Sequence, residues 1–98
     1  MIRHTVVFRL KHPSGSAEER SFLQAACELM SIEGVQSFEC LRQISPKNNY
    51  TFGLSMEFAD ESAYAFYSKH LDHVTFVQQR WIPEVAEFTE IDYVPHAP

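Results

Sequence analysis

The segment FYSKHLDHVTF, at residues 66–76, carries the residue types best suited to chemistry in this chain. His70 and His73 lie three residues apart, with Tyr67 before them and Phe76 after them. Histidine has an ordinary pKa of about 6.5, so modest changes in its surroundings let it exchange protons near neutral pH. The segment therefore has three interpretations: an acid–base pair, a metal site, or polar groups that serve only packing.

In the acid–base interpretation, His73 takes a proton from a carbon next to a carbonyl group. Tyr67 donates a hydrogen bond to the oxygen that becomes an enolate, and an apolar pocket strengthens both effects. The two residues are six positions apart, so one straight helix does not bring them together. We therefore expect a bend near Leu71 and Asp72 if the pair acts in this way.

In the metal interpretation, His70, His73 and His4 join an Asp or Glu, because His-x-x-His spacing suits zinc or another transition metal. The two cysteines, Cys27 and Cys40, are badly placed to help. In the structural interpretation, His70 caps or packs at a helix end and His73 hydrogen-bonds a backbone carbonyl. The neighbouring apolar residues are then plain core: Phe66, Phe76, Val77 and Trp81. We expect neither a metal nor a cofactor.

The spacing of apolar residues predicts the elements that position this segment. Strands are expected at residues 2–11, 35–43, 50–58 and 85–94, and helices at residues 16–31 and 60–70, the second continuing for a turn or two until Pro83 interferes. Ser16 and Glu19 have the spacing of a capping box, and Asp60 or Ser62 caps the second helix. The order β-α-β-β-α-β predicts an α+β, ferredoxin-like fold, a four-stranded antiparallel sheet with helices on one face and the first strand central.

One face of this sheet is expected to form the core beneath the helices. Its members by strand periodicity are Ile2, His4, Val6, Phe8 and Leu10, then Tyr50, Phe52, Leu54, Met56 and Phe58, then Ala86, Phe88 and Glu90. The first helix adds an apolar stripe of Phe22, Leu23, Ala26, Cys27 and Met30. His4 and Glu90 come from neighbouring strands, and a buried charge needs a partner. They therefore form either a satisfied pair that fixes packing or part of the lining of a small pocket.

The opposite face of the sheet is expected to have no helix over it. It carries Val7, Ile91, Tyr93 and Val85 among polar residues. Leaving these in water exposes apolar area, and a second copy of the chain is the natural cover. We therefore expect a homodimer, sheet against sheet, which makes a dimeric α/β barrel.

The bulk composition sets the remaining limits. The 98 residues suffice for one domain, residues 1–98. The net charge of −5 and the scattered basic residues argue against nucleic-acid partners. No segment is long and apolar enough for a membrane span, and the first residues do not read as a signal peptide, so we expect a cytoplasmic protein with two buried free thiols.

The motifs HTVVFRL near the start and YSKHLDHVTF…W…F…IDYVP near the end together resemble the stress-responsive A/B barrel family. That resemblance implies ferredoxin-like protomers that dimerise through their sheets. The family includes plant stress-related proteins, bacterial members of unknown role, and olivetolic acid cyclase, a cofactor-free polyketide cyclase. By this likeness a catalytic tyrosine and histidine fall on Tyr67 and His73, and a strand histidine falls on His4.

The resemblance also implies an apolar pocket wall at Phe8, Leu54 and Phe88, to which we add Phe22 and Glu90 as ligand-binding residues. The chain departs from the cyclase at two positions, where Phe52 replaces a second strand histidine and Glu90 replaces an apolar residue. A shared substrate is therefore not expected. The leading hypothesis is a homodimer that binds a small apolar carbonyl or aromatic compound. The alternatives are a cofactor-independent cyclase or isomerase and a non-catalytic stress-protective protein. A further hypothesis, a monooxygenase with the same barrel architecture, is not supported by any residue of the sequence.

Overall fold

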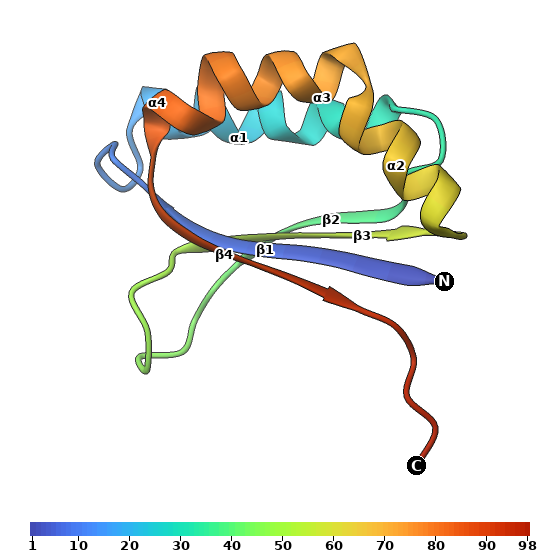
Figure 1. The fold of residues 1–98 in the computed structure, drawn as a ribbon. Coiled ribbons are helices and arrows are strands. Elements are labelled where there is room, and N and C mark those ends of the chain that lie inside the picture. The colour runs from blue at the N-terminus through green and yellow to red at the C-terminus, as the bar shows by residue number, and fades with distance from the viewer.

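A four-stranded antiparallel sheet with helices on one face forms the protein in the computed structural model, which describes residues 1–98 (Figure 1). The strands are β1 (Ile2–Leu10), β2 (Gln36–Arg42), β3 (Phe52–Phe58) and β4 (Val85–Tyr93). Their order across the sheet is β2-β3-β1-β4, so β1 is central, between β3 and β4. This arrangement confirms the ferredoxin-like α+β fold.

The helices form a layer over one face of the sheet, and the other face carries none (Figure 1). They are α1 (Ala17–Cys27) with a 3₁₀ turn at Glu28–Ser31, α2 (Glu61–Lys69), α3 (Leu71–Phe76), a π-helical stretch at Val77–Trp81, and α4 (Ile82–Glu84). None of them is long and apolar enough to cross a membrane.

The core lies between the sheet and the helices, as the strand alternation predicts. On β1 every second residue from His4 to Leu10 is buried, and on β3 the alternate residues from Phe52 to Phe58 are buried. The most deeply buried large side chains are Phe8, Phe22, Phe58 and Met56. Burial of such aromatic side chains stabilises the domain by about 2–3 kcal/mol each.

Helix α1 begins as the sequence predicts, with one difference in the capping. The Ser16 hydroxyl accepts from the Glu19 amide, but the Glu19 carboxylate accepts from the Gly15 amide and not from Ser16. At its other end the helix tightens into the 3₁₀ turn, which rotates the following side chains. Leu29 is therefore buried and Met30 is 55% exposed, so the expected place of Met30 in the apolar stripe is wrong.

Two strand predictions also need correction. Strand β3 starts at Phe52, and Tyr50 lies outside it with its hydroxyl 2.5 Å from the Thr89 hydroxyl instead of in the core. On β4 a register shift against β1 changes which side chains face the helices. Val85 is buried and Ala86 exposed, the reverse of the predicted alternation.

The helical segment also runs farther than the sequence predicts, past Pro83 to Glu84. The π-helical stretch precedes the proline, and the amide of Ile82, which follows the stretch, donates to the Val77 carbonyl. A wider helical turn thus carries the chain to the proline, which lies in the first turn of α4, where a missing amide is tolerated.

Candidate functional site

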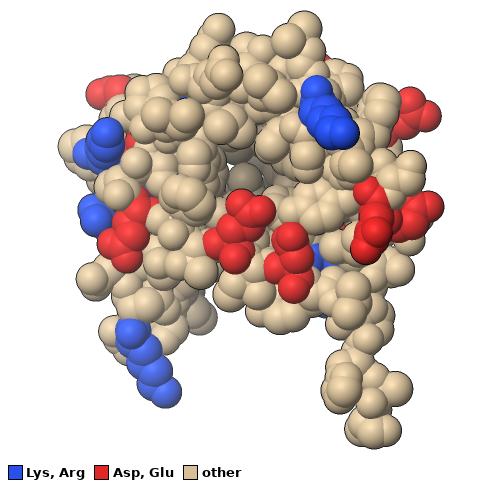
Figure 2. All heavy atoms as spheres, in the orientation of Figure 1, with Lys and Arg blue, Asp and Glu red and all other residues tan.

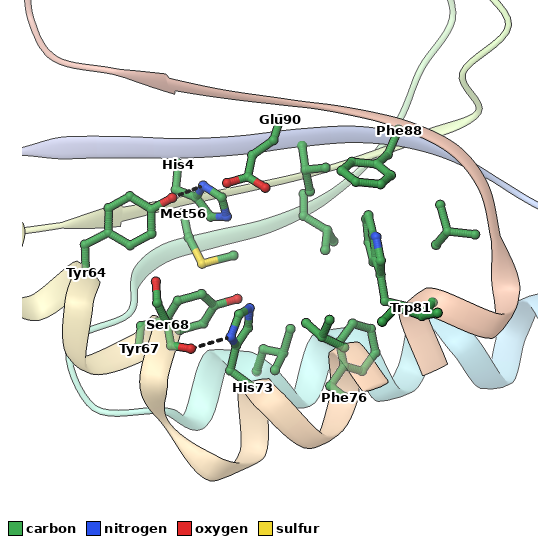
Figure 3. A pocket seen from close by; sticks show the side chains of 16 residues that line it. His4, Met56, Tyr64, Tyr67, Ser68, His73, Phe76, Trp81, Phe88 and Glu90 are labelled. Atoms are coloured by element: carbon green, nitrogen blue, oxygen red, sulfur yellow. Dashed lines mark hydrogen bonds between the residues drawn. The ribbon is translucent and has the colours of Figure 1, made fainter. Parts of the chain in front are cut away.

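A half-open cavity of about 520 Å³ lies between the sheet and the helices α2 to α4 (Figure 3). Of its 16 lining residues, 12 are hydrophobic, and the polar ones gather at the end nearest α2. His4, Tyr67, His73 and Glu90 all contribute to the lining. Ligand pockets in proteins commonly have this size and this mixture of apolar walls and few polar groups.

A break in the helical segment brings Tyr67 and His73 together. His70 has extended backbone angles, ends α2 and caps α3, where its Nδ1 accepts from the Asp72 amide at 3.0 Å. This break at His70 is the bend expected near Leu71 and Asp72. As a result the Tyr67 and His73 rings lie 4.4 Å apart between centroids, although six residues separate them.

His73 is held as a neutral base that faces the cavity. Its Nδ1 lies 3.1 Å from the Ser68 carbonyl oxygen, which can only accept, so Nδ1 carries the proton. The other ring nitrogen, Nε2, points into the cavity with a free lone pair (Figure 3). Burial lowers the pKa of His73 below its ordinary value and outweighs the hydrogen bond to Ser68, so the ring is neutral at pH 7.

Tyr67 supplies a hydrogen-bond donor beside this base. The residue is only 2% exposed, and no buried polar side-chain atom of the protein lacks a partner. Because its hydroxyl bonds no protein group, that hydroxyl opens into the cavity. Burial, with a smaller contribution from the Glu90 charge, raises the pKa of Tyr67 above its ordinary value, so the hydroxyl stays protonated at neutral pH.

His4 lies across the cavity from His73 and is oriented by two groups. Its Nδ1 lies 2.6 Å from Asp92 Oδ1 and 2.9 Å from the Tyr64 hydroxyl. Tyr64 donates to the second Asp92 oxygen at 2.8 Å, and burial together with this bond raises the pKa of Tyr64. Nδ1–H therefore donates to Asp92, which leaves His4 Nε2 as the nitrogen that faces the cavity (Figure 3).

The same chain matches the family described as the Stress responsive A/B Barrel Domain over residues 2–95. The chain belongs to this family. Among curated protein sequences none matches it.

Solved structures agree with the A/B barrel assignment. A dabb family protein with a ferredoxin-like fold from Mesorhizobium loti is 62% identical, with 98% of this chain and 97% of that chain covered and a TM-score of 0.96. The Arabidopsis thaliana protein At3g17210 is 22% identical over 100% and 98% of the two chains, with a TM-score of 0.86. A dimeric ferredoxin-like protein of unknown function from Thermobifida fusca is 19% identical over 96% and 90%, with a TM-score of 0.79.

Not every residue expected at the site of this A/B barrel protein lines the cavity. Leu54 and Phe88 do, and Phe88 is half exposed at its edge. Phe8 and Phe22 are fully buried and are not part of the lining. Both rings pack against Trp81, at centroid distances of 5.0 and 6.1 Å, and Trp81 takes the wall position expected for them.

Glu90 lines the cavity as expected, but it is not the hydrogen-bond partner of His4. In the register of β1 and β4, Glu90 lies opposite Val6, and Asp92 lies opposite His4. Asp92 is thus the bonding partner of the histidine. Glu90 lies beside the His4 ring in the cavity wall (Figure 3). Two residues of this network, Tyr64 and Asp92, were not expected at the site, although Asp92 follows Glu90 by two on the same strand face.

The histidines of the His-x-x-His motif do not converge on one point. His70 caps α3 while His73 bonds Ser68, so the two rings serve different backbone groups. The one cluster with the composition of a metal site is His4, Glu90 and Asp92, whose donor atoms lie within 4.8 Å of one another.

The two cysteines are free, as expected, but they are not both buried. Cys27 is half-buried and Cys40 is exposed as a residue. Burial, together with the neighbouring Cys27 thiol, nevertheless raises the pKa of Cys40 to about 11. Thiolate chemistry at neutral pH is therefore disfavoured there.

Proposed function

We propose that this A/B barrel protein binds a small, largely apolar carbonyl or aromatic compound in the cavity under its helices. The observation that supports the proposal most directly is the cavity itself, with apolar walls and polar atoms that converge at one end. The Tyr67 hydroxyl, free of protein partners, is suited to donate to a carbonyl oxygen of the bound compound. The apolar body then lies along Phe76, Trp81 and Phe88.

We further propose a cofactor-independent proton transfer at the carbon next to that carbonyl. The supporting observation is the fixed tautomer of His73, whose Nε2 is an unprotonated base aimed into the cavity. In this reaction Nε2 takes the proton, the C–H electron pair moves into the enolate, and Tyr67 donates to the enolate oxygen. His73 then returns the proton to carbon, which is the core of an isomerase or cyclase reaction.

The binding proposal is tested with 2-acetonaphthone, an aromatic methyl ketone, and with 2-ethylnaphthalene, which has the same rings without the carbonyl. Both are expected to raise the melting temperature, and the ketone is expected to raise it more because it accepts from Tyr67. The difference disappears in Tyr67→Phe. If neither compound stabilises the protein, the cavity is not a site for apolar ligands.

The proton-transfer proposal is tested by exchange of the methyl protons of 2-acetonaphthone in deuterium oxide, followed by proton NMR. Removal of a positioned acid–base group costs about 10²–10⁴-fold in rate. His73→Gln, which replaces the imidazole base with a neutral polar side chain of similar size, should therefore lose nearly all exchange above the buffer rate. His96→Gln, in the exposed terminal segment, is the matched control. Equal exchange in His73→Gln and the wild type contradicts the assigned role.

We also propose that two copies pair through the helix-free face of the sheet (Figure 1). Leu41, Ile91 and Tyr93 are each 43–52% exposed there, among half-buried residues such as Val7. The structurally similar protein from Thermobifida fusca is described as dimeric, which supports the proposal. Such pairing removes apolar area from water without touching the cavity lining.

A further inference from the structure

The polar end of the cavity has an acidic character that the proposed carbonyl chemistry does not explain. Glu90 lines the cavity and Asp92 lies next to it, while none of the 16 lining residues is a lysine or an arginine. Figure 2 shows acidic side chains along the rim below the hollow that opens on this face. An entering ligand therefore meets negative charge first.

Glu90 is not neutralised by a neighbouring cation. The ion pairs of the protein engage the carboxylates of Glu57, Asp92, Glu87, Glu84 and Asp72, but not that of Glu90. Asp92 has only the His4 ring as an ionic partner. With a neutral His4 the cluster carries two negative charges, and with a protonated His4 it carries one.

The Glu90 charge also acts across the cavity. It contributes to raising the pKa of Tyr64 and Tyr67 and opposes the lowering of the pKa of His73. These three residues come from the helices, on the far side of the cavity from β4. The Glu90 carboxylate also lies on the cavity side of β4, beside the His4 ring (Figure 3), so it faces the space that a ligand would occupy.

We propose that the ligand carries a protonated amine, which Glu90 and Asp92 bind at the polar end while its apolar body fills the rest of the cavity. This inference rests on the proposed ligand binding and narrows it to amine-bearing aromatic or carbonyl compounds. Besides the two carboxylates, Tyr67 is a nearly fully buried side chain with an unpartnered hydroxyl in the same cavity. That hydroxyl marks the space as a ligand site.

An ammonium group fits this cluster without displacing any of its hydrogen bonds. Acceptors placed around an ammonium nitrogen at hydrogen-bond distance lie about 4.6 Å apart. The donor atoms of His4, Glu90 and Asp92 all lie within 4.8 Å of one another, which is compatible with that spacing. Both Asp92 oxygens already accept hydrogen bonds, one from His4 at 2.6 Å and one from Tyr64 at 2.8 Å, and an ammonium can donate to their remaining lone pairs.

The experiment measures binding of three compounds with one aromatic body by calorimetry at low ionic strength: 2-(2-naphthyl)ethylamine, 2-(2-naphthyl)ethanol and 2-naphthylacetate. At pH 7 they are a cation, a neutral compound and an anion. One close carboxylate favours the cation by about five- to tenfold over the neutral alcohol. The anion is expected to bind more weakly than the alcohol, and added salt should reduce both differences.

Glu90→Gln removes the charge but keeps the shape, and it should bring the amine to within about twofold of the alcohol. Glu87→Gln, on the same strand but paired with Arg9 and outside the cavity, should leave the order unchanged. Equal or weaker binding of the amine in the wild type overturns the inference, while alcohol binding alone upholds the proposed apolar site. Tight binding of Zn²⁺ alone that Glu90→Gln abolishes also overturns it, because the carboxylates then serve a metal.

Discussion

Two tyrosines at the cavity, Tyr64 and Tyr67, provide a direct test of which polar groups hold the fold and which await a ligand. The same substitution, Tyr→Phe, removes only a hydroxyl at each position. The Tyr64 hydroxyl donates to Asp92 at 2.8 Å and contacts His4 at 2.9 Å, whereas the Tyr67 hydroxyl has no protein partner. Tyr64→Phe should therefore lower the stability of the free protein, whereas Tyr67→Phe should weaken ligand binding and leave the stability nearly unchanged.

The expected magnitudes follow from these contacts. A hydrogen bond to a charged group contributes about 1.5–3 kcal/mol, and the exposure of Asp92, 39%, reduces this. Tyr64→Phe should therefore cost about 1–2 kcal/mol, which lowers the melting temperature of a domain of this size by roughly 5–15 °C. Its ring still stacks on Phe58 at 5.0 Å. Tyr67→Phe should change the stability by less than about 0.5 kcal/mol.

The assay is thermal unfolding at one fixed protein concentration, with and without 2-acetonaphthone. Tyr67→Phe should melt with the wild type in the absence of ketone and bind it roughly two- to tenfold more weakly, the share of one net hydrogen bond. If Tyr67→Phe destabilises the free protein as much as Tyr64→Phe does, the Tyr67 hydroxyl is a structural group. Its assignment as the ligand donor is then refuted.

Three further predictions concern charge, assembly and pH. Burial tends to raise the pKa of Glu84, but hydrogen bonds from Arg80 and His12 outweigh it and lower that pKa. The stability that these bonds contribute should therefore be complete above about pH 4.5 and lost as the pH falls through the lowered pKa of Glu84. Glu84→Gln should accordingly lower the melting temperature at pH 7 and have little effect in strong acid, whereas a constant difference would contradict the linkage. Ile91→Lys places a charge on the helix-free face of the sheet and should give a monomer in sedimentation, whereas Glu28→Lys, on the helical side, should leave the dimer intact. A monomeric wild type would contradict the proposed pairing of the sheets. The exchange rate of 2-acetonaphthone should rise with pH through an apparent pKa below 6.5, because burial lowers the pKa of His73. The rate should then stay level beyond pH 10, because the raised pKa of Tyr67 keeps its hydroxyl protonated there. A rise centred above pH 7 would exclude His73 as the base.

The sheet and its core could be predicted because strand periodicity is a local property of the sequence. Alternation on β1 and β3 matches their burial almost residue for residue. The failures occur where backbone geometry departs from the ideal repeat. The register shift on β4 turned Val85 inward, and the 3₁₀ turn after α1 turned Met30 outward, and no composition signal marks either.

The site could be predicted only in part, because it depends on distances between strands. His4, Tyr67, His73 and Glu90 were expected at one pocket, and all four line it. The partner of His4 was not found, since a shift of two residues in the β1–β4 register decides between Glu90 and Asp92. Side chains at those two positions share one strand face, so periodicity cannot separate them.

The aromatic wall of the cavity could not be predicted from the sequence for a different reason. Phe8 and Phe22 have the spacing of core residues, and the fold keeps them there. Trp81 reaches the wall through the π-helical stretch, whose wider turn changes the direction of the following side chains. Such a stretch has no reliable sequence signature, although π-helical segments are often found at functional sites.

The helix break at His70 connects the fold to the proposed chemistry. An uninterrupted helix would place Tyr67 and His73 on different faces, and only the break brings their rings to 4.4 Å. The break leaves amides at the start of α3 without helical partners, and the His70 ring accepts from one of them. The freed Ser68 carbonyl in turn accepts from His73 and fixes its tautomer. One interruption therefore makes both the pocket and the protonation state of its base, and His70 supports that base without touching the cavity.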